Sequence, residues 1–529
     1  RRFEPELPAG YLQWVSLGVA AAWLLHPFNL TSVLYVVQRM TSLSAVFCIW
    51  GMVAYLWGRI RLHEGRSGYL PILAGLLICA PLAALSKESG ALLPLLMLVA
   101  EISLFNFQAP KVAARRFLAV FFILTVGIPA AAVLAYVAVH PQWLPATYIT
   151  RDFNLGERMM TEARVLWFYL RLIIFPSIRE MGLFHDDIVI SRSLLHPVTT
   201  MLSIAGIAAL AGLSYLVRKK APLITFGVLF FLAGHLLEST VLPLEIAHEH
   251  RNYLPMFGLL LALFFYLLYP LRYRQNLRIR QAAAVMLVSL FAFGTFARAT
   301  EWSNPFDLTA REVANHPESA RNNGEMAGIY ASIETPDPLV MESHYQSARF
   351  HYEKAVSLNA GNTHGLFGLI MLSATRGKPV ESNWIRELNH RLANAPYGAD
   401  NGDNLVRMVT CQMQGICKLA NGEIRSLLQA PLLNRSATGS NKALALSAFG
   451  YYLVNVERDY PAALAAMYQA ADYAPGELEH RLTLIKFLIA LNRNDEAKAQ
   501  IAILKRLDTM QAYTAAIESQ DKLLAGPNQ

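Results

Sequence analysis

Long apolar stretches dominate the first 300 residues of the chain, and shorter alternations of apolar and polar residues follow them. Nine of the apolar stretches have about the length that a helix needs to cross a membrane. They cover residues 9–26, 42–58, 69–86, 90–107, 117–139, 198–217, 222–243, 253–271 and 282–300. We therefore predict an all-α chain, with a polytopic membrane helix bundle over residues 1–300 and a soluble helical-repeat domain over residues 301–529.

A tenth apolar stretch, residues 163–176, is shorter than the others and contains Arg164 and Arg171. Its length and its two charges suit an interfacial or re-entrant helix better than a full crossing. We therefore do not count it as a span.

Basic residues gather in four of the loops between the predicted spans. These loops contain Arg59, Arg61 and Arg66; Lys111, Arg115 and Arg116; Arg218, Lys219 and Lys220; and Arg272, Arg274, Arg278 and Arg280. Nine crossings put all four loops on one side, and the positive-inside rule makes that side cytoplasmic. The remaining loops and, because the number of crossings is odd, the region after Thr300 are then expected on the outer face.

Composition agrees with a membrane protein. Hydrophobic residues make up 54% of the chain and charged residues only 16%, against about 25% charged residues in soluble domains. The net charge of +8 is accounted for by the basic loops. It therefore needs no nucleic-acid partner as an explanation.

The region after Thr300 carries a repeating pattern of small and larger apolar residues. The recurring positions are Ala348, Tyr352 and Ala355; Ala463, Met467, Ala470 and Pro475; and Ala497, Ile501 and Leu504. From Ala463 to Ala497 is 34 residues, the period of a tetratricopeptide (TPR) repeat. Because the early Trp and Gly positions are poorly kept, we predict a degenerate TPR-like array. Such an array either binds a protein partner or serves as a spacer over the membrane domain.

Four cysteines divide between the two regions. Cys48 and Cys79 lie in apolar spans, where a thiol packs as a small hydrophobe. Cys411 and Cys417 are six residues apart around Gly415, and no nearby His adds a zinc-binding spacing. In an oxidising compartment this spacing favours a local disulfide over a metal site.

Residues 248–253 (HEHRNY) join two apolar spans and place four ionisable side chains at an expected membrane edge. Polar groups are costly there unless the protein uses them. One interpretation is a site for an anionic ligand such as a lipid-linked phosphate. The other is an interfacial turn whose basic residues meet lipid headgroups.

Other outer loops carry candidate chemistry. The guanidinium of Arg39 could donate two hydrogen bonds to a phosphate, or the side chain could extend to lipid headgroups. Lys87 and Glu88 form a polar turn that could neutralise a phosphate or pair with other loops. His185, Asp186 and Asp187 could bind a divalent cation through oxygen ligands or supply a general base, although adjacent Asp residues are also common in solvated loops and helix caps.

Several chemistries of soluble enzymes are excluded by their missing motifs. The chain has no hydrolase serine elbow, no phosphate-binding Gly-rich loop, no HExxH and no paired CxxC.

Four features in order along the chain carry a family resemblance. They are residues 26–31 (HPFNLT) running on to 37–39 (VQR), residues 85–90 (LSKESG), residues 249–255 (EHRNYLP), and the TPR-like repeats. Together they resemble bacterial multi-spanning TPR-repeat membrane proteins. These are similar to the transmembrane and TPR-containing protein O-mannosyltransferases of the GT-C glycosyltransferase superfamily.

The resemblance implies an enzyme that takes a sugar from a polyprenyl-phosphate carrier and transfers it to a protein or glycan hydroxyl. The C-terminal domain would lie in the periplasm of a bacterium, beyond the inner membrane. The resemblance implies that Arg39, Lys87, Glu88, His250 and Arg251 organise the site and hold the phosphate, and it places Asp186 and Asp187 in a loop where relatives also carry acidic residues. We therefore take Asp186, Asp187 and Glu249 as catalytic candidates; Arg39, Lys87, His248, His250 and Arg251 as ligands of the donor phosphate; and His26, Gln38, Glu88 and Tyr253 as supporting residues. A divalent metal is a candidate cofactor, with its ligands left open.

One departure from the family keeps other functions open. GT-C enzymes place their principal catalytic acid in the first outer loop, and no Asp or Glu occurs between Glu6 and Glu64. Three explanations are open. The acid lies before Arg1, another carboxylate such as Asp186 takes its role, or the protein is not catalytic. The alternatives are an oligosaccharide ligase or O-oligosaccharyltransferase, and a TPR scaffold of the cell envelope.

Overall fold

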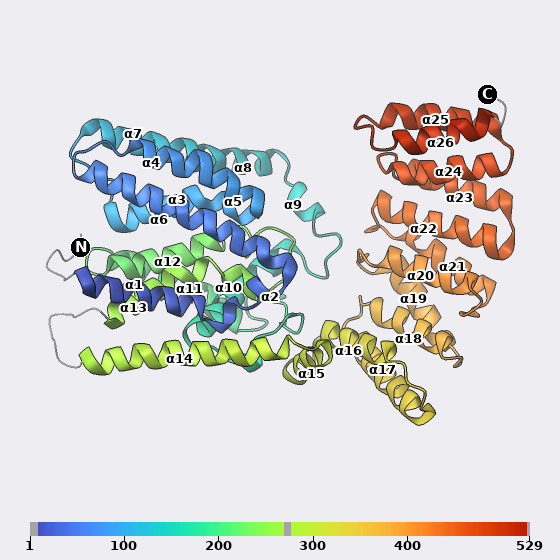
Figure 1. The fold of residues 1–529 in the computed structure, drawn as a ribbon, viewed down its shortest axis with the longest axis horizontal. Coiled ribbons are helices and arrows are strands. Elements are labelled where there is room, and N and C mark those ends of the chain that lie inside the picture. The colour runs from blue at the N-terminus through green and yellow to red at the C-terminus, as the bar shows by residue number, and fades with distance from the viewer. Residues whose placement is uncertain (1–8, 269–276, 526–529) are drawn as a thin grey trace. The chain divides into compact units, whose positions relative to one another are not determined.

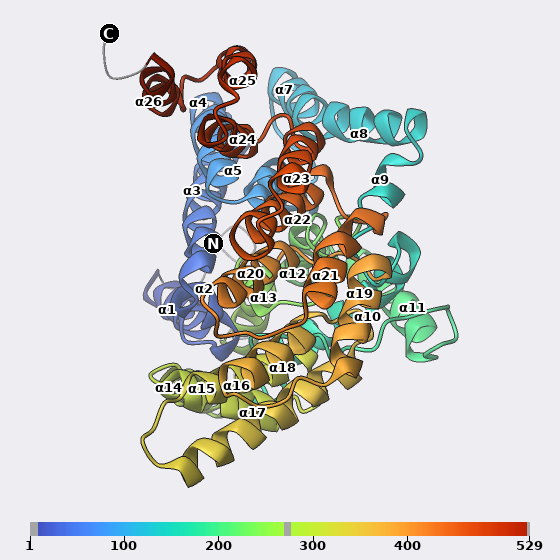
Figure 2. The same cartoon turned by 90° about the vertical axis from the view of Figure 1, so that its right-hand side faces the viewer.

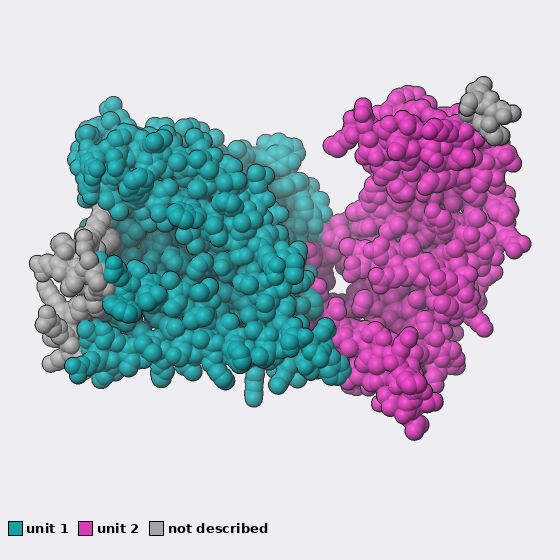
Figure 3. Space-filling view, in the orientation of Figure 1, with its two compact units in different colours: residues 1–148, 153–317 teal, residues 149–152, 318–529 magenta. Residues whose placement is uncertain are grey.

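The computed structural model describes residues 9–268 and 277–525, and the regular elements in these two ranges are all helical (Figure 1). The chain divides into two compact units (Figure 3). Unit 1 comprises residues 1–148 and 153–317, and unit 2 comprises residues 149–152 and 318–529. The division thus falls after Pro317 rather than after Thr300 as we predict, because α15 (Pro305–Asn315) packs against α14 (Leu277–Glu301).

Unit 1 contains α1 to α15. Besides α14 and α15, its helices are α1 (Ala9–Leu24), α2 (Thr31–Leu34), α3 (Arg39–His63), α4 (Tyr69–Ala74), α5 (Ala80–Ser86), α6 (Leu93–Ala100), α7 (Val112–Phe122), α8 (Ile128–Val139), α9 (Trp143–Ala146), α10 (Leu155–Ile174), α11 (Thr199–Leu216), α12 (Pro222–Gly234) and α13 (Pro255–Leu268). Short helical turns join or extend several of them: η1 (Pro27–Asn29), η2 (Val36–Gln38), η3 (Gly75–Cys79), η4 (Glu88–Leu92), η5 (Glu101–Phe105), η6 (Ile123–Gly127), η7 (Ile178–Glu180) and η8 (Glu249–Asn252).

Six helical segments of the described chain are long and apolar enough to cross a membrane. They are Val36–His63, Tyr69–Ser86, Glu88–Phe105, Val112–Val139, Thr199–Leu216 and Leu277–Glu301. The pair Leu12–Leu24 and Pro27–Leu34, bent by 51°, makes a seventh if it is one span. These segments identify a membrane protein.

The predicted span 222–243 forms a shorter apolar helix, α12, with 13 residues. The predicted span 253–271 contains α13 with 14 residues, and its last residues, 269–271, lie outside the described residues. The two helices pack closely, because a Cβ at Gly227 would lie 2.6 Å from the carbonyl oxygen of Gly258. Small residues at a helix contact allow such an approach of two backbones. A run of turns and irregular backbone leads from the end of α12 to η8, and this run carries polar residues.

The tenth apolar stretch belongs to α10, which begins well before residue 163. Asn154 starts the helix with a capping box: its side chain accepts from the Glu157 amide at 3.0 Å, and the Glu157 carboxylate accepts from the Asn154 amide at 2.9 Å. The extra N-terminal turns bury Arg158 and Glu162. In agreement with our interpretation, α10 is not among the candidate spans.

Arg59 is not a loop cation as we predict from the charge pattern. It lies inside α3 and is fully buried, where its guanidinium donates to both oxygens of the Glu101 carboxylate at 2.6 and 2.8 Å. Tyr55 donates to the same carboxylate at 2.6 Å. A charge can be buried in an apolar setting only with a partner of this kind, so Glu101 accounts for the position of Arg59.

Unit 2 is a succession of helices in which most neighbours along the chain pack together (Figures 1 and 2). It comprises α16 (Ala320–Ser332), α17 (Pro338–Leu358), α18 (His364–Thr375), α19 (Ser382–Asn394), α20 (Asn401–Met413), α21 (Asn421–Leu433), α22 (Gly439–Tyr452), η9 (Leu453–Glu457), α23 (Tyr460–Tyr473), α24 (Leu478–Ala490), α25 (Asn494–Leu507) and α26 (Thr514–Ala525).

The recurring positions of the sequence pattern lie in the core of unit 2. Buried among them are Ala348, Tyr352, Ala355, Ala463, Met467, Ala470, Ala497, Ile501 and Leu504. Helices α23 and α25 both have 14 residues. They begin at Tyr460 and Asn494, one period of 34 residues apart. Cys411 and Cys417 form a disulfide that closes the turn after α20.

We expect Glu101→Gln to destabilise unit 1 by about 3 to 5 kcal/mol, because it leaves the Arg59 charge buried without a counter-charge. Thermal unfolding in detergent measures the effect. Arg66→Ala is the matched control, since Arg66 pairs with Glu64 at an exposed site and such a pair contributes about 0 to 1 kcal/mol. The double variant Arg59→Met with Glu101→Gln should recover part of the loss, and equal stability of Glu101→Gln and Arg66→Ala would contradict the assignment.

Candidate functional site

The loops that we predict for the outer face meet at one end of unit 1. Hydrogen bonds and ion pairs connect them across large separations in sequence. They include His26 to the carbonyl of Ile173 at 3.0 Å, Lys87 to Glu238 at 2.7 Å, Tyr169 to the carbonyl of His248 at 3.1 Å, and Asp187 to His316 at 2.8 Å. The apolar helices thus bring the polar loops to a common place.

The turn η8 lies between two groups of polar side chains. All four of its residues are buried, and Asn252 holds it in place: the amide donates to the carbonyl of Glu249 at 3.2 Å, and the amide oxygen contacts Nε2 of His235 at 3.1 Å. Two clusters result. The cation cluster contains Lys87, Arg158, Glu162, Glu238 and Arg251. The histidine cluster contains His185, Asp187, Glu249, Arg298, Glu312 and His316.

In the cation cluster, Lys87 donates to Glu238 at 2.7 Å and to the Thr41 hydroxyl at 3.0 Å. Arg158 pairs with Glu162 at 2.8 Å and also donates to four backbone carbonyls of residues 238–245. Arg158 therefore positions the polar segment after α12. Arg251 donates to the carbonyl of Ile246 at 3.1 Å and is buried.

The cation cluster carries more positive than negative charge. Three cations stand against the carboxylates of Glu162 and Glu238. Burial raises the pKa of Glu162 to about 7 although Arg158 and Arg251 lower it, so Glu162 is only partly ionised at neutral pH. Burial also acts to raise the pKa of Glu238, but Lys87 and Arg251 outweigh it and hold that pKa below its ordinary value. The surplus is therefore at least one positive charge.

A small cavity of about 20 Å³ opens beside this cluster. Its lining includes Glu238, Arg251, Thr41, Ser44 and Ser89. The space holds about one water molecule, so a larger ligand has to displace side chains that now fill the site.

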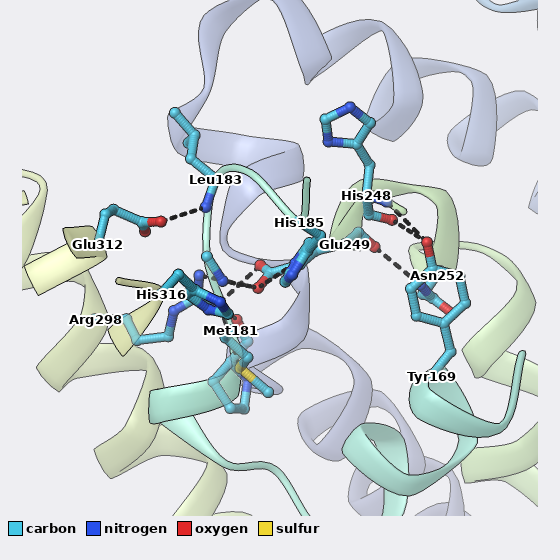
Figure 4. A network of polar contacts seen from close by, with 12 residues as sticks. Tyr169, Met181, Leu183, His185, His248, Glu249, Asn252, Arg298, Glu312 and His316 are labelled. Carbon is cyan, nitrogen blue, oxygen red and sulfur yellow. Dashed lines mark hydrogen bonds and ion pairs between the residues drawn. The ribbon is translucent and has the colours of Figure 1, made fainter. Parts of the chain in front are cut away.

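The histidine cluster is built around the carboxylate of Glu249 (Figure 4). This carboxylate is buried and accepts from the Gly182 amide at 2.8 Å and from the two terminal nitrogens of Arg298 at 2.9 and 3.3 Å. Arg298 also donates to the carbonyl of Pro27 at 2.7 Å. One ion pair thus connects the end of α14 with η8, η1 and the loop after η7.

Beside this pair, His185, Asp187 and His316 each offer a donor atom, and the three atoms lie within 4.8 Å of one another. Asp187 Oδ2 and His316 Nδ1 are 2.8 Å apart. His185 Nε2 lies 4.0 Å from Glu249 Oε1. The imidazoles of His185 and His316 meet edge to face, with their ring centroids 5.4 Å apart.

Gly182 makes the close packing of this cluster feasible. A Cβ at this position would lie 2.6 Å from Glu312 Oε2 and 3.2 Å from His316 Nε2. Glu312 accepts from the amide of Leu183 at 3.0 Å. A larger residue at position 182 would therefore displace Glu312 or His316.

Protonation in the histidine cluster follows from burial and pairing. Burial lowers the pKa of His185 to about 3, so this ring is neutral. Burial opposes the charged forms of Asp187 and His316, but their mutual hydrogen bond outweighs it, lowering the pKa of Asp187 and raising that of His316. Burial raises the pKa of Glu312 to about 7.

The structure brings part of the predicted set together at the two clusters. Lys87 and Arg251 belong to the cation cluster, and Asp187 and Glu249 belong to the histidine cluster. His250 is buried near Lys87 and Arg251, and burial with these charges lowers its pKa. His248 stacks on His250 with ring centroids 5.0 Å apart and contacts Glu245 at 2.5 Å.

Other predicted residues have structural partners or lie at the surface. His26 accepts from the amide of Phe28 and so caps η1. The carbonyl of Tyr253 accepts from Trp23, and Gln38 accepts from Thr41. Arg39, Glu88 and Asp186 are exposed. Arg39 donates to the carbonyl of Val33, and the partner of Lys87 is Glu238 rather than the adjacent Glu88.

Sequence reasoning missed six residues of the two clusters. They are Arg158, Glu162, Glu238, Arg298, Glu312 and His316. Arg298 and Glu238 each carry a charge inside a predicted span, a signal that marks a paired or functional group. The other four residues lie in polar stretches of the sequence, where one more charged or polar residue does not stand out.

No family model matches the chain, and no curated protein is significantly similar to it.

We expect the Glu312 carboxyl to make stability fall as the pH rises. Its pKa of about 7 lies above the ordinary 4.5, so the folded state holds a proton that the unfolded state has lost. The stabilisation is fully present below pH 4.5 and is lost as the pH rises through about 7, a change of up to about 3 kcal/mol.

Thermal unfolding of the wild type and of Glu312→Gln, followed from pH 4.5 to 8 in metal-free buffer, measures this contribution. Glu312→Gln should show the flatter dependence, while Glu301→Gln, at the end of α14, should follow the wild type. Parallel curves for Glu312→Gln and the wild type would rule out the shift.

Proposed function

We propose that this protein is a membrane glycosyltransferase that moves a sugar from a polyprenyl-phosphate carrier to an acceptor hydroxyl. The observation that carries the proposal is the surplus of buried positive charge in the cation cluster. A buried charge without a full set of counter-charges is costly, and an anionic ligand would balance it. Residues 26–31, 85–90 and 249–255 resemble motifs of GT-C glycosyltransferases, and this resemblance suggests the same kind of donor.

Lys87 and Arg251 are the cations that we assign to the donor phosphate. Both are buried and act on the carboxylate of Glu238, which therefore lies where their positive potential is strong. A phosphate brings the same sign of charge with more acceptor oxygens, and a guanidinium can bind two of them at once. Arg158 is less suited, because its donors are engaged by backbone carbonyls.

In the proposed reaction, the acceptor oxygen forms a bond to the anomeric carbon while the bond from that carbon to the phosphate oxygen breaks. The lipid phosphate leaves with the electron pair, and Lys87 and Arg251 stabilise its charge. The acceptor proton passes to a carboxylate. We assign the proton to Asp186, a catalytic candidate of the sequence analysis that is exposed and therefore accessible to an acceptor.

We further propose that the end of unit 1 with both clusters faces the periplasm of a bacterium, and that unit 2 is a TPR-like array there. The basic loops support the first proposal. The shared length and the 34-residue offset of α23 and α25 support the second.

A groove in unit 2 offers a place for a protein acceptor or partner. It has a volume of about 330 Å³ and is lined by apolar Leu366, Leu369 and Trp384 and by charged Glu353, Glu387 and Arg391. Glu387 and Arg391 form an ion pair at 2.7 Å. Apolar walls with a few charged groups suit an extended peptide.

We expect Arg251→Ala to lower sugar transfer by about 100-fold or more, because it removes a charge that stabilises the departing phosphate. The measurement is transfer of radiolabelled sugar from polyprenyl-phosphate donors in membranes that contain the full-length natural protein. Arg179→Ala is the control, since Arg179 is exposed. Equal transfer by Arg251→Ala and the wild type would contradict the assignment, and no transfer by the wild type from any donor would contradict the function.

We expect Asp186→Asn to lower the rate of transfer by about 100-fold while donor binding is kept, because the amide cannot accept the acceptor proton. Single-turnover transfer and equilibrium binding of the labelled donor separate the two effects. Asp307→Asn, at an exposed position of α15, should leave both unchanged. A loss of donor binding in Asp186→Asn would assign Asp186 to binding instead.

A further inference from the structure

We propose that His185, Asp187 and His316 bind one divalent transition-metal ion, with Zn²⁺ as the best match. The proposal does not depend on glycosyl transfer, because it rests on the donor atoms of the histidine cluster alone. Two of the ligands come from the loop after η7, and the third follows α15, 129 residues further along the chain.

Geometry is the first argument. The three donor atoms already lie within 4.8 Å of one another, and ligands that share one ion at about 2.0 to 2.2 Å come somewhat closer than this. Only small movements of side chains are therefore needed. Among the described residues, no other group of three His, Cys, Asp or Glu residues meets this condition.

Unpartnered donor atoms are the second argument. Nε2 of His185 and Nε2 of His316 are both buried and have no hydrogen-bond partner within the described part of the chain. His185 is 4% exposed. Buried polar atoms almost always have a partner, and two orphaned imidazole nitrogens in one cluster point to a ligand that accepts their lone pairs.

Charge is the third argument. Asp187, Glu249 and Glu312 bring three carboxyl groups to the cluster, whereas Arg298 is the one permanent cation that the described residues place there. Both oxygens of Glu249 are engaged by Arg298 and Gly182. Carboxyl groups therefore outnumber permanent cations in the histidine cluster, and a bound cation would balance the difference.

The donor set selects the class of ion. Two imidazoles and one carboxylate suit Zn²⁺ and other borderline first-row ions, and a fourth position remains for water. Mg²⁺ and Ca²⁺ prefer oxygen ligands throughout. The side chain of Asp187 is 23% exposed, so an ion can enter from this side.

The carboxylates around the three proposed ligands are themselves held by an ion pair and a hydrogen bond. Glu249 lies 4.0 Å from His185 Nε2 and is fixed by Arg298, and Glu312 is fixed by the amide of Leu183. Glu249 therefore adds a fixed negative charge beside the proposed ion. Gly182 leaves the space that Glu312 and His316 occupy.

Metal analysis of the full chain, purified without a histidine tag and dialysed against metal-free buffer, tests the proposal. We expect about one Zn²⁺ per wild-type chain, and about a tenth of this or less in His185→Ala and His316→Ala. His140→Ala is the control, since His140 is exposed, and it should keep the wild-type content. Unchanged content in both site variants would overturn the proposal.

A second measurement covers a site variant that fails to fold. Wild-type protein is stripped with a chelator, and Zn²⁺, Mg²⁺ or buffer is then added before thermal unfolding. We expect Zn²⁺ and not Mg²⁺ to raise the melting temperature, and Co²⁺ in place of Zn²⁺ to give a visible absorption band. No shift with Zn²⁺, or an equal shift with Mg²⁺, would overturn the assignment whatever the transfer assay shows.

Discussion

The buried ion pair between Arg298 and Glu249 is the interaction on which the polar end of unit 1 depends. It joins the last turn of α14 to η8, and further hydrogen bonds extend it to Pro27 and Gly182. Removing a charge from water is expensive, and the cost is recovered only when each donor and acceptor finds a partner. The pair therefore admits few arrangements of the four segments. Packing of apolar helices alone would leave their relative positions much less restricted.

Chemistry is divided between the two sides of η8. Arg251 contributes to the cation cluster, which also draws Lys87 from the loop after α5, and Glu249 contributes to the histidine cluster, which draws His316 from beyond α15. The first cluster has surplus positive charge and suits an anion, whereas the second has surplus carboxylate and imidazole and suits a cation. The short turn η8 can contribute residues to both clusters, because the side chains of successive residues in a tight turn point in different directions.

Residues 222–243 show where the apolar pattern predicts the end of a helix wrongly. Their composition predicts one span, but the helix ends at Gly234, and Glu238 beyond it is paired with Lys87. Arg59 shows the opposite error, since its place in the charge pattern predicts a loop cation and it lies fully buried against Glu101. In both cases the outcome depended on a partner distant in sequence. Hydropathy registers the cost of burying a charge but not the presence of the group that offsets it.

The sequence by itself determined the helical class, the membrane character and the loops on which polar residues concentrate, because the helix period and apolar length are local properties. It also marked His185, Asp187 and residues 248–251 as candidate chemistry. Only the tertiary structure decided that His316 completes one cluster and that Arg298 holds Glu249. Those partners lie 129 and 49 residues away along the chain. Their meeting follows from how the helices pack, which no local pattern encodes.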